Sequence, residues 1–159
     1  MKSKYLFSHK LKPFGWILFS VGIVLGIILL INNFDYPNWK INVFSIFGRP
    51  AIFSSTKSFA WGLNNVADEI ASILIIVGGI LVSFSETKEE DEYISKIRME
   101  SLIWATYVNY IVLLLAVIFV FDMAFFNVMI FNMFTILFFF IIRFHFLLYK
   151  TKSLISNEE

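Results

Sequence analysis

The side chains that could carry out chemistry are few, and the acids and bases among them lie at the ends of apolar segments. His9 and His145 are the only histidines and there is no cysteine, which excludes disulfides, thiol catalysis and cysteine-ligated zinc or iron–sulfur sites. A haem held between the two histidines is conceivable, because both flank helix ends on one side, but we favour two interfacial histidines. Intramembrane hydrolysis needs Ser–His, paired-Asp or zinc-binding groups within the bundle, and no CxxC, HExxH or phosphate-cradling glycine loop is present. We therefore expect no catalytic residue, cofactor site or metal site, and no enzymatic activity.

The composition indicates an integral membrane protein. Of the 159 residues, 58% are hydrophobic, 16% are charged and 20 are Phe, and the mean hydropathy is +0.77. A soluble domain is nearer half apolar and a quarter charged, and a small soluble core could not hide this much apolar bulk. The net charge of +1 cancels an uneven distribution, so no nucleic-acid partner is expected.

Four apolar segments predict an all-α membrane protein with one domain of four transmembrane helices. The spans are residues 14–31, 66–84, 101–121 and 124–146, each long enough for a hydrocarbon core of about 30 Å. Residues 32–65 form one long loop outside the cytoplasm, rich in turn formers and aromatic residues. We predict a small β-hairpin there, with its rings in an aromatic belt at headgroup level or, as the less favoured alternative, on a docking surface.

Small and polar residues mark the packing faces of the first two spans. In the first span Gly22 and Gly26 form a small-xxx-small pair that lets another helix approach closely, and we favour a partner helix within the chain. In the second span a small and polar stripe is expected to face the bundle, and Asn64 or Asn65 is expected to cap the helix. Asp68 is interpreted as an interfacial residue matched to the helix dipole, or else as an ion or proton site. The stripe comprises Asp68, Ser72, Gly79 and Ser83.

The one strongly charged block, residues 86–100, predicts an amphipathic helix that continues into the third span. Read from Glu89 to Phe121, it is a single rod that extends into the cytoplasm. Its exposed acids and the apolar stripe beside them are candidates for docking a partner. These candidates are Glu89, Glu90, Asp91, Glu92, Tyr93, Ile94 and Ile97.

Within the third and fourth spans the polar candidates are Asn109, Asn132 and Thr135. An antiparallel hairpin centred near Ala124 would place Arg143 level with Ala105, so that its side chain reaches toward Glu100. In that register Asn109 and Asn132 are not level, and no direct amide pair is expected. Glu100 and Arg143 are interpreted as structural charges at the interface.

The distribution of Lys and Arg predicts that both termini are cytoplasmic. With four spans, the termini and the loop after the second span share one side, which carries ten Lys or Arg, whereas the other side carries Lys40, Arg49 and Lys57. The positive-inside rule makes the richer side cytoplasmic. We expect a multi-pass protein of the bacterial inner membrane.

Four stretches carry a resemblance: Lys88–Leu102, Tyr107–Tyr110, Phe131–Thr135 and Ile141–Phe144. In these the chain resembles a group of small, uncharacterised four-span bacterial membrane proteins, over somewhat more than its second half. The resemblance implies the four-span architecture and brings no activity, cofactor or site.

Three functional hypotheses follow. The leading one is a non-enzymatic accessory or interaction subunit of a membrane assembly, surrounded by membrane lipids and docked on a protein partner or a second copy. The first alternative is a small oligomeric channel or transporter, with Asn109, Asn132 and Thr135 as pore-lining candidates. The second is a lipid- or quinone-binding protein that uses the aromatic-rich outer loop.

Overall fold

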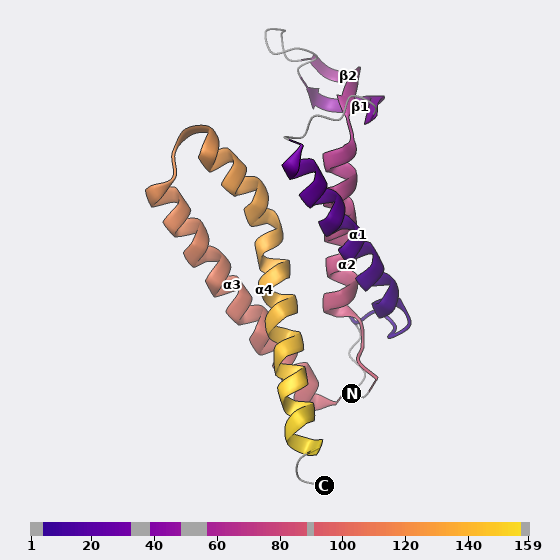
Figure 1. Ribbon diagram of the computed structural model, residues 1–159, viewed down its shortest axis with the longest axis vertical. Helices are drawn as coiled ribbons and strands as arrows, with labels where there is room; N and C mark the ends of the chain where they lie inside the picture. Colours follow the sequence, from indigo (N-terminus) through magenta and orange to yellow (C-terminus); the bar gives the residue numbers. More distant parts are fainter. Residues whose placement is uncertain (1–4, 33–38, 49–56, 89–90, 157–159) are drawn as a thin grey trace.

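The computed structural model describes residues 5–32, 39–48, 57–88 and 91–156. All four of its helices are long and apolar enough to cross a membrane, which confirms the predicted number of spans. Together with a small two-stranded sheet (Figure 1), the elements are α1 (Leu11–Ile31), β1 (Lys40–Gly48), β2 (Lys57–Asn65), α2 (Ala67–Phe84), α3 (Glu92–Phe119) and α4 (Asp122–Ser156).

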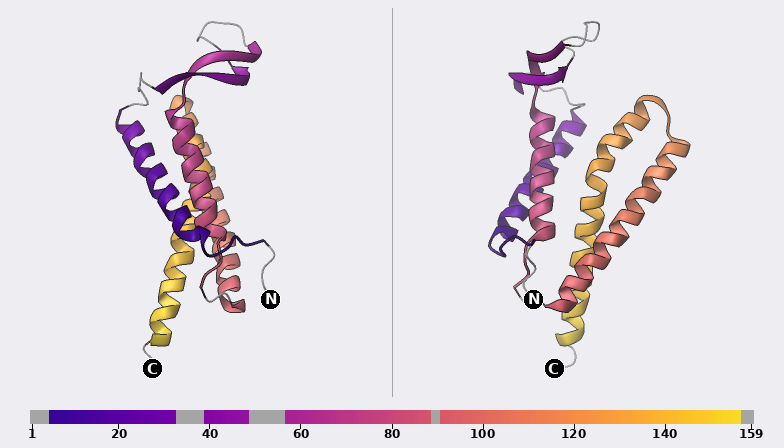
Figure 2. Two further views of the ribbon diagram at one scale, coloured as in Figure 1. Left: turned by 90° about the vertical axis from the view of Figure 1, so that its right-hand side faces the viewer. Right: turned by 180° about the vertical axis from the view of Figure 1, so that it is seen from behind.

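The helices form two antiparallel hairpins, α1 with α2 and α3 with α4, and α2 packs against α4 to join them. The sheet and the turn between α3 and α4 lie at one end of the molecule, which we name the sheet end (Figure 2). α1 begins and α4 ends at the opposite end, the termini end. The α3–α4 hairpin leans away from α1 toward the sheet end, so the two hairpins are closest near the termini end.

The predicted β-hairpin is present. β1 and β2 pair antiparallel, from Lys40 opposite Asn65 to Gly48 opposite Lys57. The backbone N–H of Val66 donates to the Trp39 carbonyl (3.2 Å), and the Ala67 N–H donates to Asn65 Oδ1 (3.2 Å). The base of the sheet is therefore fixed to the first turn of α2, and Asn65 satisfies a free amide at that helix start.

Three glycines bring α1 and α2 so close that a methyl group would not fit between them. A Cβ atom on Gly15 would lie 2.7 Å from Leu81 Cβ, one on Gly22 would lie 2.8 Å from the Ile75 backbone N, and one on Gly78 would collide with the Phe19 backbone. A Cβ atom on Gly26 would meet only Ile75 Cδ1, at 3.8 Å. The glycine face of α1 is thus used within the chain, but the close contact is made by Gly15 and Gly22 and does not extend to Gly26.

The charged block forms a shorter helix than the sequence predicts. α3 begins at Glu92 because the Asp91 carboxylate accepts the Ile94 N–H (2.8 Å) and caps the helix. Residues 86–88 are not helical, and Glu89 and Glu90 lie outside the described residues. The prediction of one rod starting at Glu89 is therefore wrong at this end, although α3 does extend nine residues before the predicted span.

The segment before α1 is attached to the connection after α2. The Phe7 N–H donates to the Phe84 carbonyl, and the Glu86 N–H donates to the Phe7 carbonyl, both at 2.9 Å. His9 Nδ1 lies 2.9 Å from the Glu86 carbonyl oxygen. These bonds hold the start of α1 beside the end of α2.

Candidate functional site

The predicted docking stripe on α3 is largely covered by the chain itself. Ile97 is only 6% exposed and belongs to the core cluster that contains Phe140 and Phe144. Ile94 is partly buried against the same cluster, whereas Tyr93 is 55% exposed. Of the three apolar candidates, only Tyr93 offers substantial surface to a partner.

The predicted docking acids differ in how far they are already engaged. Asp91 is exposed but caps α3, and Glu92 is exposed in the first turn of that helix. Glu89 and Glu90 lie outside the described residues. Asp91 therefore has a structural role of its own in addition to any contact with a partner.

Glu100 pairs within its own helix, at the spacing expected of opposite charges one turn apart, and Arg143 does not reach it. Glu100 lies 4.0 Å from Lys96, one turn earlier on α3. The Arg143 guanidinium lies 4.6 Å from the centre of the Trp104 ring, a cation–π distance. The prediction that Arg143 reaches Glu100 is therefore wrong, because Trp104 holds its side chain against α3.

Asn109 and Asn132 form a direct amide pair between α3 and α4. Asn132 Nδ2 donates to Asn109 Oδ1 at 3.3 Å, so the prediction of no such pair is wrong. The turn between the helices is centred between Val120 and Phe121, and not at Ala124, because α4 already begins at Asp122. Asp122 turns the chain with a left-handed φ of 58°. Asn109 is eleven residues before Val120 and Asn132 is eleven residues after Phe121, which makes the two level.

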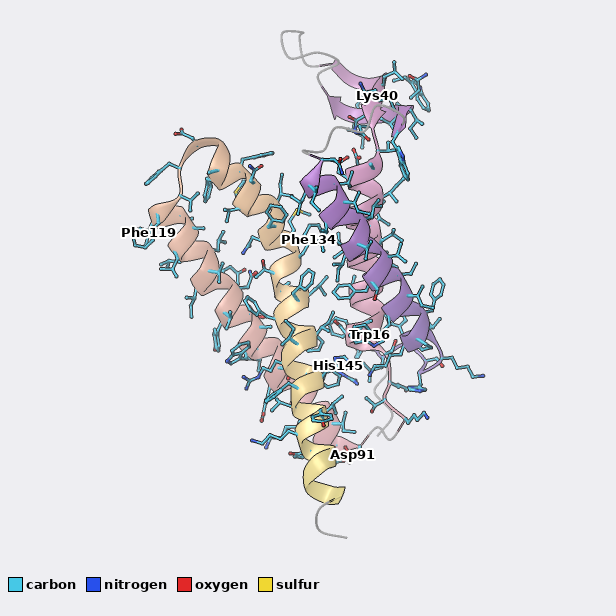
Figure 3. The ribbon with its side chains drawn as sticks, viewed as in Figure 1. Trp16, Lys40, Asp91, Phe119, Phe134 and His145 are labelled. Carbon is cyan, nitrogen blue, oxygen red and sulfur yellow. The ribbon has the colours of Figure 1, made fainter. Side chains whose placement is uncertain are left out.

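A pocket of about 830 Å³ lies between the two helical hairpins; we name it the inter-hairpin pocket. Its walls come from α1, α2 and α4, and Phe134 projects from α4 toward the α1–α2 hairpin (Figure 3). The pocket is lined by Ile23, Gly26, Ile27, Leu29 and Leu30 of α1, by Asp68, Ala71, Ser72 and Ile75 of α2, and by Asn127, Ile130, Phe131, Phe134, Thr135, Phe138 and Phe139 of α4.

The polar lining residues are concentrated toward the sheet end. Asp68 is in the first turn of α2 and Asn127 in the second turn of α4, and both are exposed. Ser72 lies one turn below Asp68. Thr135 is deeper, and its hydroxyl donates to the Phe131 carbonyl of its own helix (3.1 Å). The α2 and α4 walls therefore become more apolar away from the sheet end, whereas the α1 wall is apolar throughout.

At the termini end the seam between α1 and α4 is closed by aromatic contacts. His145 packs on Trp16 with ring centres 5.3 Å apart, and Phe19 packs on Phe138 at 5.3 Å. His145 Nδ1 lies 2.9 Å from the Ile141 carbonyl oxygen. Among the described residues, no group of three or more His, Asp or Glu side chains could hold a metal ion.

Two tyrosines of α3 point away from the rest of the chain. Tyr107 is 66% exposed and Tyr110 is 63% exposed. They share a stripe with Ile103 and Leu114, which are exposed as well and lie at steps of four, three and four residues. We name these four residues the tyrosine face. Neither tyrosine hydroxyl has a hydrogen-bond partner within the described part of the chain.

Three contributors escaped the sequence analysis. Gly78 rather than Gly79 meets the backbone of α1, whereas a Cβ atom on Gly79 would face Leu137 of α4 at 3.2 Å. Adjacent positions on a helix point about 100° apart, so Gly78 faces α1 and Gly79 faces α4. The sequence shows two adjacent small residues but not which helix each one contacts. Asn127 lies within the fourth apolar segment and was not predicted as a functional residue. Its isolated amide in an apolar run is the sequence feature that could have identified it. Gly15, seven residues before Gly22 and so on the same face of α1, was not predicted as a contact.

No protein-family model, no curated protein and no solved structure matches this chain. The resemblance to small four-span bacterial proteins therefore stays a prediction.

Proposed function

We propose that this chain is a non-enzymatic accessory subunit of a bacterial inner-membrane assembly, with both termini in the cytoplasm. In this proposal the tyrosine face of α3 contacts a transmembrane helix of the partner. The observation that carries the proposal is the exposure of Tyr107 and Tyr110 without a hydrogen-bond partner in the described chain.

The depth of these hydroxyls gives the observation its weight. Tyr110 lies ten residues beyond Glu100, the last charged residue before the apolar part of α3, so its Cα is about 15 Å further along the axis at 1.5 Å per residue. That is roughly half of a 30 Å hydrocarbon core. The Tyr107 Cα is only seven residues, or about 10 Å, beyond Glu100, and helical side chains point back toward the N-terminus, so the Tyr107 hydroxyl lies nearer the interface than the Tyr110 hydroxyl. A polar group without a partner in hydrocarbon is unfavourable. A partner helix that offers hydrogen-bond acceptors to the two tyrosine hydroxyls would therefore be held against α3 by both bonds.

The cytoplasmic surface is a weaker candidate for the principal contact. Ile97 and most of Ile94 are covered by the core, which leaves Tyr93 and the neighbouring acids. An acidic surface of this kind contributes more to the rate and selectivity of association than to its strength. The intramembrane face therefore supports the proposal better than the predicted stripe does.

The channel alternative has less support. Asn109 and Asn132 bond to each other, and Thr135 bonds within α4. These groups are occupied inside one hairpin and do not line a polar path through it.

The test is the mass of the assembly purified from its source membrane in lipid discs, compared with the 18.5 kDa chain. The variant Tyr107→Phe with Tyr110→Phe keeps both rings and removes both hydroxyls. Intramembrane hydrogen bonds average about 0.6 kcal/mol with a maximum of about 1.7, so loss of the two together should weaken the assembly by about 7- to 300-fold.

The control is Tyr149→Phe, because Tyr149 is 77% exposed near the end of α4 and outside the tyrosine face. It should leave the assembly intact. A wild-type chain that purifies only as a monomer would contradict the proposal. So would a double-phenylalanine variant that retains the assembly at the wild-type dissociation constant.

A further inference from the structure

The inter-hairpin pocket begins where the glycine-mediated contact of α1 with α2 stops, although Leu29 still packs on Ala67 and Ala71 nearer the sheet end. Gly22 touches the Ile75 backbone, but a Cβ atom on Gly26, one turn nearer the sheet end, would meet only Ile75 Cδ1 at 3.8 Å. α4 meets the other wall with Phe134 and Phe138. The resulting volume of about 830 Å³ falls within the range of sites that hold small ligands.

Two walls of the pocket, those from α2 and α4, carry polar groups toward the sheet end, and the α1 wall is apolar. Asp68, Ser72 and Asn127 provide oxygen and amide groups toward the sheet end, whereas Ile75 and Phe138 line the deeper part. A molecule with a polar end and a hydrocarbon tail would match this gradient with its tail directed toward the middle of the helices. Amphiphiles of this kind surround any membrane-spanning chain.

The charge of the lining restricts the polar end. Asp68 is the one charged residue among the described residues that line the pocket, and no Lys or Arg accompanies it there. A carboxylate accepts hydrogen bonds but cannot donate them when ionised, and it disfavours a polar end with a net negative charge. Ser72 and Asn127 both donate and accept. The site therefore favours a polar end that donates hydrogen bonds.

The shape of the walls favours a flexible tail over a second helix. Helices pack closely in membranes where small residues allow their backbones to approach. The α4 wall instead presents four phenylalanines, namely Phe131, Phe134, Phe138 and Phe139. A hydrocarbon chain can follow this irregular aromatic wall, whereas a helix of a second copy would be held away from it.

We infer that the inter-hairpin pocket binds a lipid whose polar end donates hydrogen bonds and carries no net negative charge. A hydroxyl group, as in diacylglycerol, and an ammonium group, as in phosphatidylethanolamine, both satisfy this requirement. The inference does not depend on the tyrosine face, which lies on α3 and does not line the pocket.

The experiment measures binding of defined lipids to the full-length purified chain by native mass spectrometry. The probes are phosphatidylethanolamine, diacylglycerol and phosphatidylglycerol with identical acyl chains. The first or the second should bind at one molecule per chain and about tenfold more tightly than phosphatidylglycerol. Binding of diacylglycerol alone would identify a hydroxyl end, and binding of phosphatidylethanolamine alone would identify an ammonium end.

Two variants act on the pocket by different means. Gly26→Leu places a side chain in the pocket where a Cβ atom already fits, and should weaken binding of the preferred lipid at least about tenfold. Asp68→Asn removes the charge and should reduce the preference over phosphatidylglycerol to about twofold or less.

The matched controls are Val24→Leu, which adds bulk on an exposed side of α1, and Glu92→Gln, which removes an exposed first-turn carboxylate of α3 outside the pocket lining. Both should bind as the wild type does. Equal or tighter binding of phosphatidylglycerol by the wild type would overturn the inference. The inference would also be overturned if Gly26→Leu bound lipid as the wild type does, or if the wild type bound no lipid at all. A wild-type dimer that Gly26→Leu converts to a monomer would overturn it too, because a second copy of the chain would then occupy the pocket.

Discussion

Asn109 and Asn132 are the residues whose pairing ties α3 to α4 within the membrane. Asn109 is nearly buried, and its Oδ1 accepts from Asn132 Nδ2 at 3.3 Å. Asn132→Leu would leave the Asn109 amide without this partner, and we expect it to lower the free energy of unfolding by about 1–2 kcal/mol. Replacing both asparagines by leucine should lower it by less than the sum of the single changes, because no amide is then left unpaired. Reversible unfolding of the four proteins in mixed micelles measures this coupling.

Thr135→Val is the control for the amide pair, since Thr135 lies on the same helix and bonds only to its own Phe131 carbonyl. It should change the free energy of unfolding by no more than about 0.5 kcal/mol. Strictly additive effects of the two asparagine substitutions would show that the pair contributes nothing to stability.

The polar residue types were evident from the sequence, but their pairing was not. It depends on where the chain turns, and although Asp122 marks the turn as a lone charge in an apolar run, nothing in the sequence shows that α4 already begins at this residue.

At the scale of helices, the contact between α1 and α2 depends on which glycine faces which neighbour. Gly78→Ala would push a methyl group into the Phe19 backbone, whereas Gly26→Ala would place it in ordinary contact with Ile75. Both changes gain the same helix propensity of about 1 kcal/mol, so their difference isolates packing. We expect Gly78→Ala to destabilise the chain by about 1–3 kcal/mol relative to Gly26→Ala. Thermal unfolding midpoints in one detergent measure it, and equal midpoints would refute the assigned contact.

The elements themselves were largely predictable, and their ends were not. Apolar length identifies a membrane helix because about 20 residues are needed to cross the hydrocarbon, and all four were found. Helix ends depend on individual hydrogen bonds. Asp91 caps α3, and this single bond starts the helix after the predicted beginning at Glu89. The apolar stripe at the start of α3 was recognised from the sequence. Its spacing alone does not show whether α4 or an external partner covers Ile97.

At the scale of the molecule, two helical hairpins joined mainly through α2 and α4 explain why both proposed contacts lie at the margins of the bundle. The inter-hairpin pocket occupies the seam toward the sheet end, where no glycine contact draws α1 inward. The tyrosine face lies on α3, which packs mainly on α4 and leaves its other sides exposed. A compact four-helix bundle with every helix in contact with two neighbours would close the seam and leave less of α3 exposed. The pocket and the exposed face thus have one cause, which is that the hairpins meet mainly through α2 and α4. The sequence does not reveal this cause, because nothing in it indicates how the two hairpins pack on each other.

The orientation of the whole chain in the membrane is open to a direct test, since the protein has no cysteine. Single-cysteine variants can therefore be labelled without background. Asn42→Cys lies on β1 at the sheet end and Ser95→Cys lies near the start of α3 at the opposite end, and both side chains are exposed. The excess of Lys and Arg at the termini end predicts that this end is cytoplasmic. A maleimide that cannot cross membranes should label Asn42→Cys in intact cells and Ser95→Cys only after permeabilisation. The opposite pattern would reverse the orientation and place the inter-hairpin pocket in the inner leaflet, and labelling of both residues from one side would contradict the four-span arrangement.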